Sequence, residues 1–301
     1  MFRLEQTTSE TRPGHGHTLA WTEWGDRDNP RVLVCAHGLS RNGRDFDFLA
    51  RELASEYRVV CPDYPGRGRS SWLHDKSAYS NQQYYRDTLN LINSLDYEIL
   101  DWVGTSMGGL IGMALAAGPD SPIRKMVVND VGPFIPAAAL REIGDYLGRH
   151  PRFASREDAL EYYRNVYASF GALDDEHYEH FVTHGIAWDA EADQFRLEYD
   201  PAIIDQFLKV VHQDIELWDV FDRIEIPLLI LRGKKSGLLL PQTVEQMKHR
   251  HGNAISHEFE DCAHAPSLMV PEQIDVIRNW LATDQSNSGA GATSQRAELN
   301  H

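Results

Sequence analysis

Short apolar runs alternate with helical patterns along the first half of the chain, and this alternation constrains the fold more than any other feature. Residues 31–36 and 57–62 are β-rich apolar runs, and residues 45–57 between them place apolar side chains at helical spacing. Strand, helix and strand in this order predict a βαβ unit, in which the two strands lie parallel in one sheet.

The same rhythm continues further along the sequence, with one long interruption. We expect helices at 82–95, 107–117, 241–251 and 271–281, and strands at 99–104, 125–129, 227–231 and 254–259. Residues 133–218 show helical patterns but no convincing strand. We therefore predict an α/β protein with a mostly parallel sheet flanked by helices, built from residues 1–132 and 219–282, with a largely helical insertion over 133–218. The Ser-, Asn- and Gly-rich residues 283–301 are predicted to be a disordered tail.

The net charge of the chain restricts the classes of binding partner that we expect. Its 301 residues include 29 Lys and Arg against 45 Asp and Glu, a net charge of −16. Nucleic acids and anionic membranes bind proteins through excess Lys and Arg, so we expect neither partner. Residues 151–225 hold 18 acidic and 6 basic residues, a net −12. This acidity is typical of a solubilising surface, and if it lies over a pocket it favours neutral over polyanionic substrates.

Cysteine content and hydropathy bear on the compartment. The three cysteines are an odd number, which argues against a disulfide framework and predicts the reducing cytoplasm. No apolar stretch approaches the roughly 18 residues of a membrane span, and residues 1–5 lack the apolar core of a signal peptide. The oligomeric state stays open.

The strongest motif is Gly104-Thr-Ser-Met-Gly108, a G-x-S-x-G pattern between a predicted strand and a predicted helix. A serine in so tight a turn is strained, and side chains two positions to either side would clash. Ser106 is thereby predicted to project at the carboxyl edge of the sheet, above a helix N-terminus that favours developing negative charge. We predict that Ser106 is a nucleophile.

Two further loops are predicted to reach the same edge of the sheet. His37-Gly38-Leu39 follows the strand 31–36, so the N–H groups of Leu39 and Met107 are candidates for an oxyanion hole. His264 follows the last predicted strand, late in the chain, and is the candidate general base. His37 is expected to shape its loop more than to act as a base, and it is also a candidate substrate contact.

These motifs together resemble those of the α/β-hydrolase superfamily over residues 18–282. The resemblance rests on His37-Gly38, the loop from Asp63 to Ser70, the turn at Ser106 and the late His264. It implies a serine hydrolase with a Ser-His-acid triad and no cofactor, and a cap where residues 133–218 are inserted. Esterases, C–C bond hydrolases, enol-lactonases and perhydrolases share these motifs.

The acid of the implied triad is the point at which the sequence departs from the pattern. Similar hydrolases often carry Asp where this chain has Gly237, and no carboxylate lies between Glu225 and Glu245. Three interpretations stay open. Asp130, at the end of the strand before the insertion, supplies the acid; or Gly237 marks a weakened enzyme; or the chain binds a ligand without catalysis. The acid matters because a neutral amide in its place lowers kcat by about 10⁴-fold in a related enzyme.

The remaining candidates are weaker. Phe134 and Trp188 are expected to line the pocket, together with the other cap residues Ile135, Tyr146, Tyr162 and Tyr163. Arg41 and Arg44 are expected to pair with Asp45 or Asp47 rather than to hold a substrate carboxylate. His177, His180 and His184 have one-face helical spacing, which favours an exposed helix face over a metal site, so we expect no metal.

The function that these residues predict is hydrolysis of carboxylic esters with small or medium acyl chains, through an acyl-enzyme. The predicted partner is therefore a small-molecule ester. The alternatives are a C–C bond hydrolase or enol-lactonase acting on a keto acid or lactone, and a weakened or non-catalytic homologue.

Overall fold

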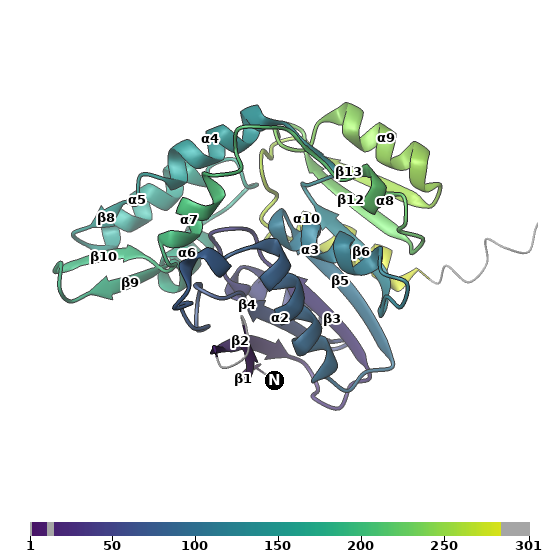
Figure 1. Cartoon of the computed structure of the whole chain (residues 1–301), viewed down its shortest axis with the longest axis horizontal. Helices are drawn as coiled ribbons and strands as arrows, with labels where there is room; N and C mark the ends of the chain where they lie inside the picture. Colours follow the sequence, from purple (N-terminus) through teal and green to yellow (C-terminus); the bar gives the residue numbers. More distant parts are fainter. Residues whose placement is uncertain (1, 11–14, 284–301) are drawn as a thin grey trace, which may run out of the picture.

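An eight-stranded sheet forms the centre of the molecule (Figure 1). The computed structural model describes residues 2–10 and 15–283, so the tail predicted over 283–301 lies, apart from Thr283, outside the described residues. The strands lie in the order β1-β2-β4-β3-β5-β6-β12-β13. β1 and β4 run antiparallel to β2, and the other neighbouring pairs are parallel. The strand bounds are Phe2–Glu10 (β1), Gly16–Trp24 (β2), Arg31–Ala36 (β3), Arg58–Asp63 (β4), Ile99–Thr105 (β5), Ile123–Asn129 (β6), Leu228–Gly233 (β12) and Ala254–Phe259 (β13).

Helices cover both faces of this sheet, and the alternation of side chains along each strand explains how. Val32 and Val34 of β3 join one core, whereas Leu33 and Cys35 join the other, because successive strand residues face opposite ways. α2, α3, α8 and α9 pack on the first face, and α1 and α10 on the second. Their bounds are Asp47–Leu53 (α1), Asn81–Asn93 (α2), Met107–Ala116 (α3), Trp218–Phe221 (α8), Pro241–His251 (α9) and Pro271–Ala282 (α10). The predicted α/β fold with a mostly parallel sheet is confirmed.

Residues 133–218 gather beside the central sheet, at the upper left of Figure 1. The helices of this segment are Ala137–Leu147 (α4), Arg156–Val166 (α5), Asp175–Gly185 (α6) and Ala202–Phe207 (α7). Aromatic residues of α5 and α6 form a small core of their own, in which Tyr163 and Phe181 are fully buried. Whether the segment is a separate cap domain stays a prediction.

The expectation that residues 133–218 hold no strand is wrong. Strands β8, β10 and β9 form a three-stranded sheet, and β11 pairs with β7. Their bounds are Phe134–Ile135 (β7), Arg152–Phe153 (β8), Ile186–Asp189 (β9), Gln194–Leu197 (β10) and Ile215–Glu216 (β11). These strands span two to four residues and mostly stay half-buried, so they lack the apolar run that marks a buried strand.

Two single-turn 3₁₀ helices complete the fold, at Gly43–Phe46 and Lys76–Ala78. The first joins the loop after β3 to α1. Among the described residues, no helix is both long and apolar enough to cross a bilayer.

Candidate active site

Ser106 lies in the turn between β5 and α3 with φ 52° and ψ −113°, a conformation that residues with side chains rarely adopt. The flanking glycines make this turn possible. A Cβ at Gly108 would lie 2.0 Å from the carbonyl oxygen of Ala36, and a Cβ at Gly104 would lie 2.4 Å from that of Gly108. The sequence motif therefore reflects a close approach of α3 to β3 and β5, which leaves Ser106 at the carboxyl edge of the sheet.

His264 brings its imidazole to Ser106 from the loop after β13. Its Nε2 lies 3.1 Å from Ser106 Oγ, and its Nδ1 lies 2.8 Å from Asp130 Oδ2. Asp130 directly follows β6 and is fully buried. Serine, imidazole and carboxylate thus form one continuous hydrogen-bonded chain, the arrangement that activates a serine for nucleophilic attack.

The loop after β12 supports the Asp130 carboxylate without contributing a carboxylate of its own. The backbone N–H of Gly233 donates to Oδ1 at 2.9 Å, and Ser236 Oγ donates to Oδ2 at 2.6 Å. At Gly237, nothing lies within 4 Å of where a Cβ would stand. Ser236 is a candidate positioning residue that sequence reasoning missed, and its position one residue before Gly237 was the available signal. Asp261 lies away from this group and pairs with Lys235 at the surface.

Both predicted oxyanion donors belong to backbone segments next to Ser106. A Cβ at Gly38 would lie 3.8 Å from Ser106 Cβ, so the loop that carries Leu39 runs beside the serine. Met107 is the first residue of α3, and an N–H at that position has no acceptor within its own helix. The buried Arg67 ties the loop in place, because its Nε donates to the carbonyl of Leu39 at 2.8 Å.

His37 borders the same cavity but is engaged in holding its loop. Its Nδ1 donates to the carbonyl of Gly38 at 2.7 Å, and its Nε2 accepts from the N–H of Tyr64 at 3.0 Å. Burial, together with the charge of Arg67, lowers the pKa of His37 to about 3, so the ring is neutral. Both nitrogens are occupied, which leaves neither for a substrate.

A mostly apolar cavity of about 430 Å³ opens over Ser106 and His264. One side is formed by the loops at the sheet edge, and the other by residues from 133–218. The apolar contributions of that segment are Ile135, Leu140, Ile143, Tyr146, Leu147, Tyr167, Phe170, Phe181, Ile203, Phe207, Val210 and Ile215. A concave apolar site with a few convergent polar groups is typical of a small-molecule pocket.

Several pocket expectations fail. Ile135 and Tyr146 line the cavity, but Phe134, Trp188, Tyr162 and Tyr163 are not among its lining residues. Trp188 is half exposed and packs edge-on against Phe195 across the β9–β10 pair. Phe134 lies in β7 opposite Glu216. The sequence shows that a residue is aromatic. It does not show which face of a short strand that residue occupies.

Two cations line the cavity, Arg41 and Lys209. Arg41 binds both carboxylate oxygens of Asp45 and lies over the ring of Phe181, with the guanidinium carbon 4.8 Å from the ring centre. Arg44 pairs with Asp47, so the expected pairing of both arginines is confirmed. Lys209 is exposed, and its ammonium donates to the side chain of Gln206 at 2.8 Å.

The chain belongs to the α/β hydrolase family, whose model matches residues 33–275, and the predicted family is thereby confirmed. The chain is 45% identical over 283 residues to the 3-hydroxybutyrate-oligomer hydrolase of Cupriavidus necator, an alignment covering 89% of this chain and 94% of that protein. It is 23% identical to the pimeloyl-[acyl-carrier protein] methyl ester esterase of Aeromonas salmonicida, over 83% of this chain and 94% of that one. An alpha/beta hydrolase from Novosphingobium aromaticivorans superposes with a TM-score of 0.81 at 31% identity, covering 93% of this chain and 98% of the other. The predicted hydrolase class agrees with these relatives.

Proposed function

We propose that this protein is a serine hydrolase that cleaves carboxylic esters through an acyl-enzyme. The observation that carries the proposal is the hydrogen-bonded chain from Ser106 Oγ through His264 to Asp130, at 3.1 Å and 2.8 Å. A strained serine at a helix N-terminus, a histidine within reach of it and a buried carboxylate behind that histidine are the parts that acyl transfer requires.

In the first half of the reaction, Ser106 Oγ attacks the ester carbonyl carbon while His264 Nε2 takes its proton. The N–H groups of Leu39 and Met107 then stabilise the oxyanion of the tetrahedral intermediate. When the intermediate collapses, the C–O bond to the alcohol breaks and His264 returns the proton to the leaving oxygen. In the second half, water attacks the acyl-enzyme with His264 as base. The carboxylic acid product leaves, and Ser106 is regenerated.

Asp130 holds His264 in the orientation and tautomer that this cycle needs, because its carboxylate accepts from the Nδ1–H. It also stabilises the imidazolium that forms in each half-reaction. Two donors, from Gly233 and Ser236, fix the carboxylate in turn. A carboxylate at position 237 is then unnecessary, which supports an active enzyme over a weakened or non-catalytic homologue.

For the substrate, we propose an ester with small or medium acyl groups, and in particular a short oligoester of 3-hydroxybutyrate. The relative named as a hydrolase of such oligomers, at 45% identity over most of both chains, supports this choice. The cavity of about 430 Å³ has an apolar lining that suits the short methyl-branched units of such a chain. A C–C bond hydrolase or enol-lactonase would use the same three residues and is the second candidate.

Lys209 fits the anionic end of such an oligomer. A 3-hydroxybutyrate oligomer ends in a carboxylate, and the other cation at the cavity, Arg41, is already paired with Asp45. One local ammonium offsets the repulsion expected from the acidic segment 151–225, in which Lys209 lies. Lys209→Met should raise KM for oligomers about two- to fivefold and leave an uncharged p-nitrophenyl ester unaffected, since exposed ion pairs contribute little.

The test of the proposed function uses Ser106→Ala. The wild type should hydrolyse p-nitrophenyl butyrate and 3-hydroxybutyrate oligomers and should be labelled at Ser106 by a fluorophosphonate probe. Ser106→Ala should lose both the turnover and the label. Undiminished turnover in this variant would refute the serine mechanism, and turnover of a keto acid or lactone in preference to esters would favour the second candidate.

The compartment stays a proposal. The three cysteines are unpaired and buried, which supports a reducing environment such as the cytoplasm.

A further inference from the structure

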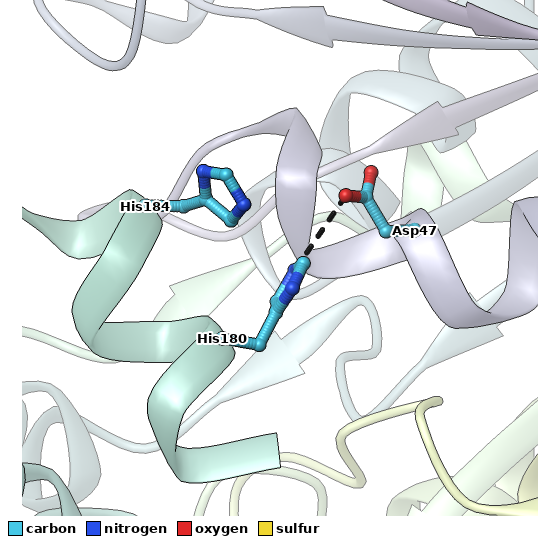
Figure 2. Close-up of side chains that lie close together, drawn as sticks. All are labelled: Asp47, His180 and His184. Carbon is cyan, nitrogen blue, oxygen red and sulfur yellow. Dashed lines mark ion pairs between the residues drawn. The ribbon is translucent and has the colours of Figure 1, made fainter. Parts of the chain in front are cut away.

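Two histidines and an aspartate meet where α6 packs against α1, apart from the proposed catalytic residues (Figure 2). His180 and His184 stand four residues apart on α6, so they share one face of that helix. Asp47 is the first residue of α1 and is buried. One potential ligand atom from each side chain lies within 4.8 Å of those of the other two.

This arrangement corrects the sequence-based expectation for the histidines of α6. Their spacing predicts an exposed helix face, but His177 is buried and its Nδ1 contacts Asp174, while His180 and His184 are half-buried. The expectation of no metal depends on the lack of a matching carboxylate nearby in the sequence. The fold supplies that carboxylate from Asp47, more than 130 residues earlier in the chain, where no local spacing could reveal it.

The imidazole of His184 is available to a metal ion. Within the described part of the chain, His184 makes no hydrogen bond through its ring, although it contacts the ring of His180 edge-on at 4.6 Å between centres. Its ligand lone pair is free.

A competing cation already occupies the carboxylate. Arg44 donates to both oxygens of Asp47, at 3.0 and 2.8 Å from Nε. His180 Nε2 donates to the backbone carbonyl of Arg44 at 2.8 Å and lies 3.7 Å from Asp47 Oδ2. The Arg44 side chain is 23% exposed, so it can swing toward solvent when another cation replaces it.

We propose that Asp47, His180 and His184 form a binding site for a divalent transition metal of the zinc class. Two imidazole nitrogens and one carboxylate oxygen suit Zn²⁺, whereas Mg²⁺ and Ca²⁺ prefer oxygen donors throughout. Zn²⁺ displaces the guanidinium of Arg44 from Asp47, so Arg44 acts as a built-in competitor that sets the affinity.

The metal would join two parts of the chain that the proposed reaction uses. α6 belongs to the segment that forms one side of the cavity, and α1 follows the loop that carries Leu39. Asn42 of that loop already donates to the backbone carbonyl of His184 at 2.7 Å. Binding across this junction should stabilise the folded protein, because the site is assembled only in that state.

The experiment is calorimetric titration of Zn²⁺ into the full chain, with a parallel measurement of Tm. We expect one Zn²⁺ per chain and a rise in Tm. His180→Gln and His184→Gln should each weaken binding about tenfold or more, since even changes around metal ligands cost 10- to 100-fold. Arg44→Gln should tighten binding, a result that chance surface binding would not give.

Two control variants show whether Zn²⁺ binds at this site and independently of ester hydrolysis. His249→Gln removes an exposed histidine on α9 and should leave Zn²⁺ affinity unchanged. Ser106→Ala should bind Zn²⁺ like the wild type, so failure of the ester-hydrolysis proposal would not affect this one. No binding, or binding that persists equally in both histidine variants of α6, would overturn the site.

Discussion

Asp130 is the residue on which the proposed chemistry depends most sharply. We expect Asp130→Asn to lower kcat for a p-nitrophenyl ester by about 10⁴, because an amide presents the wrong tautomer of the imidazole and cannot stabilise imidazolium. KM should change little. Steady-state kinetics with active-site titration checks this expectation.

The matched variant is Gly237→Asp, which adds a carboxylate at the position where similar hydrolases carry one. It should give no gain in kcat, because Asp130 already occupies Nδ1 of His264 at 2.8 Å. A large gain from Gly237→Asp, with no loss from Asp130→Asn, would show that Asp130 is not the acid.

Ser236 donates to the Asp130 carboxylate and is buried, so we propose it as a positioning residue. Ser236→Ala removes a charge-assisted hydrogen bond, so kcat/KM should fall by roughly tenfold and the acidic limb of the pH–rate profile should move. Ser236→Thr keeps the hydroxyl and should restore both. An unchanged pH–rate profile in Ser236→Ala would limit this serine to a packing role.

The sequence could suggest Ser106 and His264 because each is marked locally, by a glycine pattern or by its place after the last strand. The sequence did not show whether Asp130 supplies the acid or Gly237 marks its loss, and the reason is physical. The carboxyl ends of all parallel strands reach one edge, and the sequence does not state which strands are neighbours. The structure pairs β6 with β12, with Asn129 opposite Leu231, and this adjacency brings Asp130 and Ser236 together.

At the scale of elements, the packing of α3 against β3 depends on a missing side chain. Gly108→Ala would force a methyl group to within 2.0 Å of the Ala36 carbonyl, which the backbone must move to avoid. We expect the free energy of unfolding to fall by about 1–3 kcal/mol and turnover to fall with it. Urea denaturation measures the first effect.

Gly16→Ala is the control for that variant, because its added methyl group would meet nothing closer than 3.6 Å. It should leave the urea midpoint nearly unchanged. Equal losses in the two variants would mean that the close contact of position 108 with Ala36 is not the cause of the loss.

The elements that the sequence predicted well are the buried strands with continuous apolar runs and the helices between them, since apolar runs and helical spacing mark them directly. β1, β2 and β7–β11 escaped prediction. β2 is largely buried, but polar residues interrupt its apolar ones, so it lacks a continuous apolar run. β1 is the edge strand of the sheet, and its residues are exposed or half-buried except for Ser9. Strands that bury little apolar surface leave little trace in a sequence.

For the whole molecule, stability should depend on pH through His37. The pKa of His37 is lowered to about 3 by burial, whereas an imidazole in the unfolded chain titrates near 6.5. Below pH 6.5 the His37 imidazole binds a proton in the unfolded state but stays neutral in the folded state. The stability from neutral His37 is therefore fully present above pH 6.5 and is lost as the pH falls toward 3, by about 2 kcal/mol at pH 5.

Asp63 opposes this trend in part. Burial raises its pKa to about 6, so between pH 6 and pH 3.8 the folded state binds the extra proton and gains stability as the pH falls. Urea denaturation of wild type and His37→Asn at pH 7 and pH 5 isolates the histidine. The variant should lose less stability than the wild type between the two pH values, and parallel losses would contradict the assignment.

The cavity is bounded by two sets of residues, one that carries the proposed chemistry and one that forms the apolar wall. This separation has a consequence for protein engineering. The sheet-edge loops hold Ser106, His264 and Asp130, while α4 and α7 supply much of the apolar wall. A mutant library confined to Leu140, Ile143, Tyr146 and Phe207 could therefore be screened for new acyl preferences with the reacting atoms undisturbed. Chemistry and selectivity would then evolve on separate stretches of the gene.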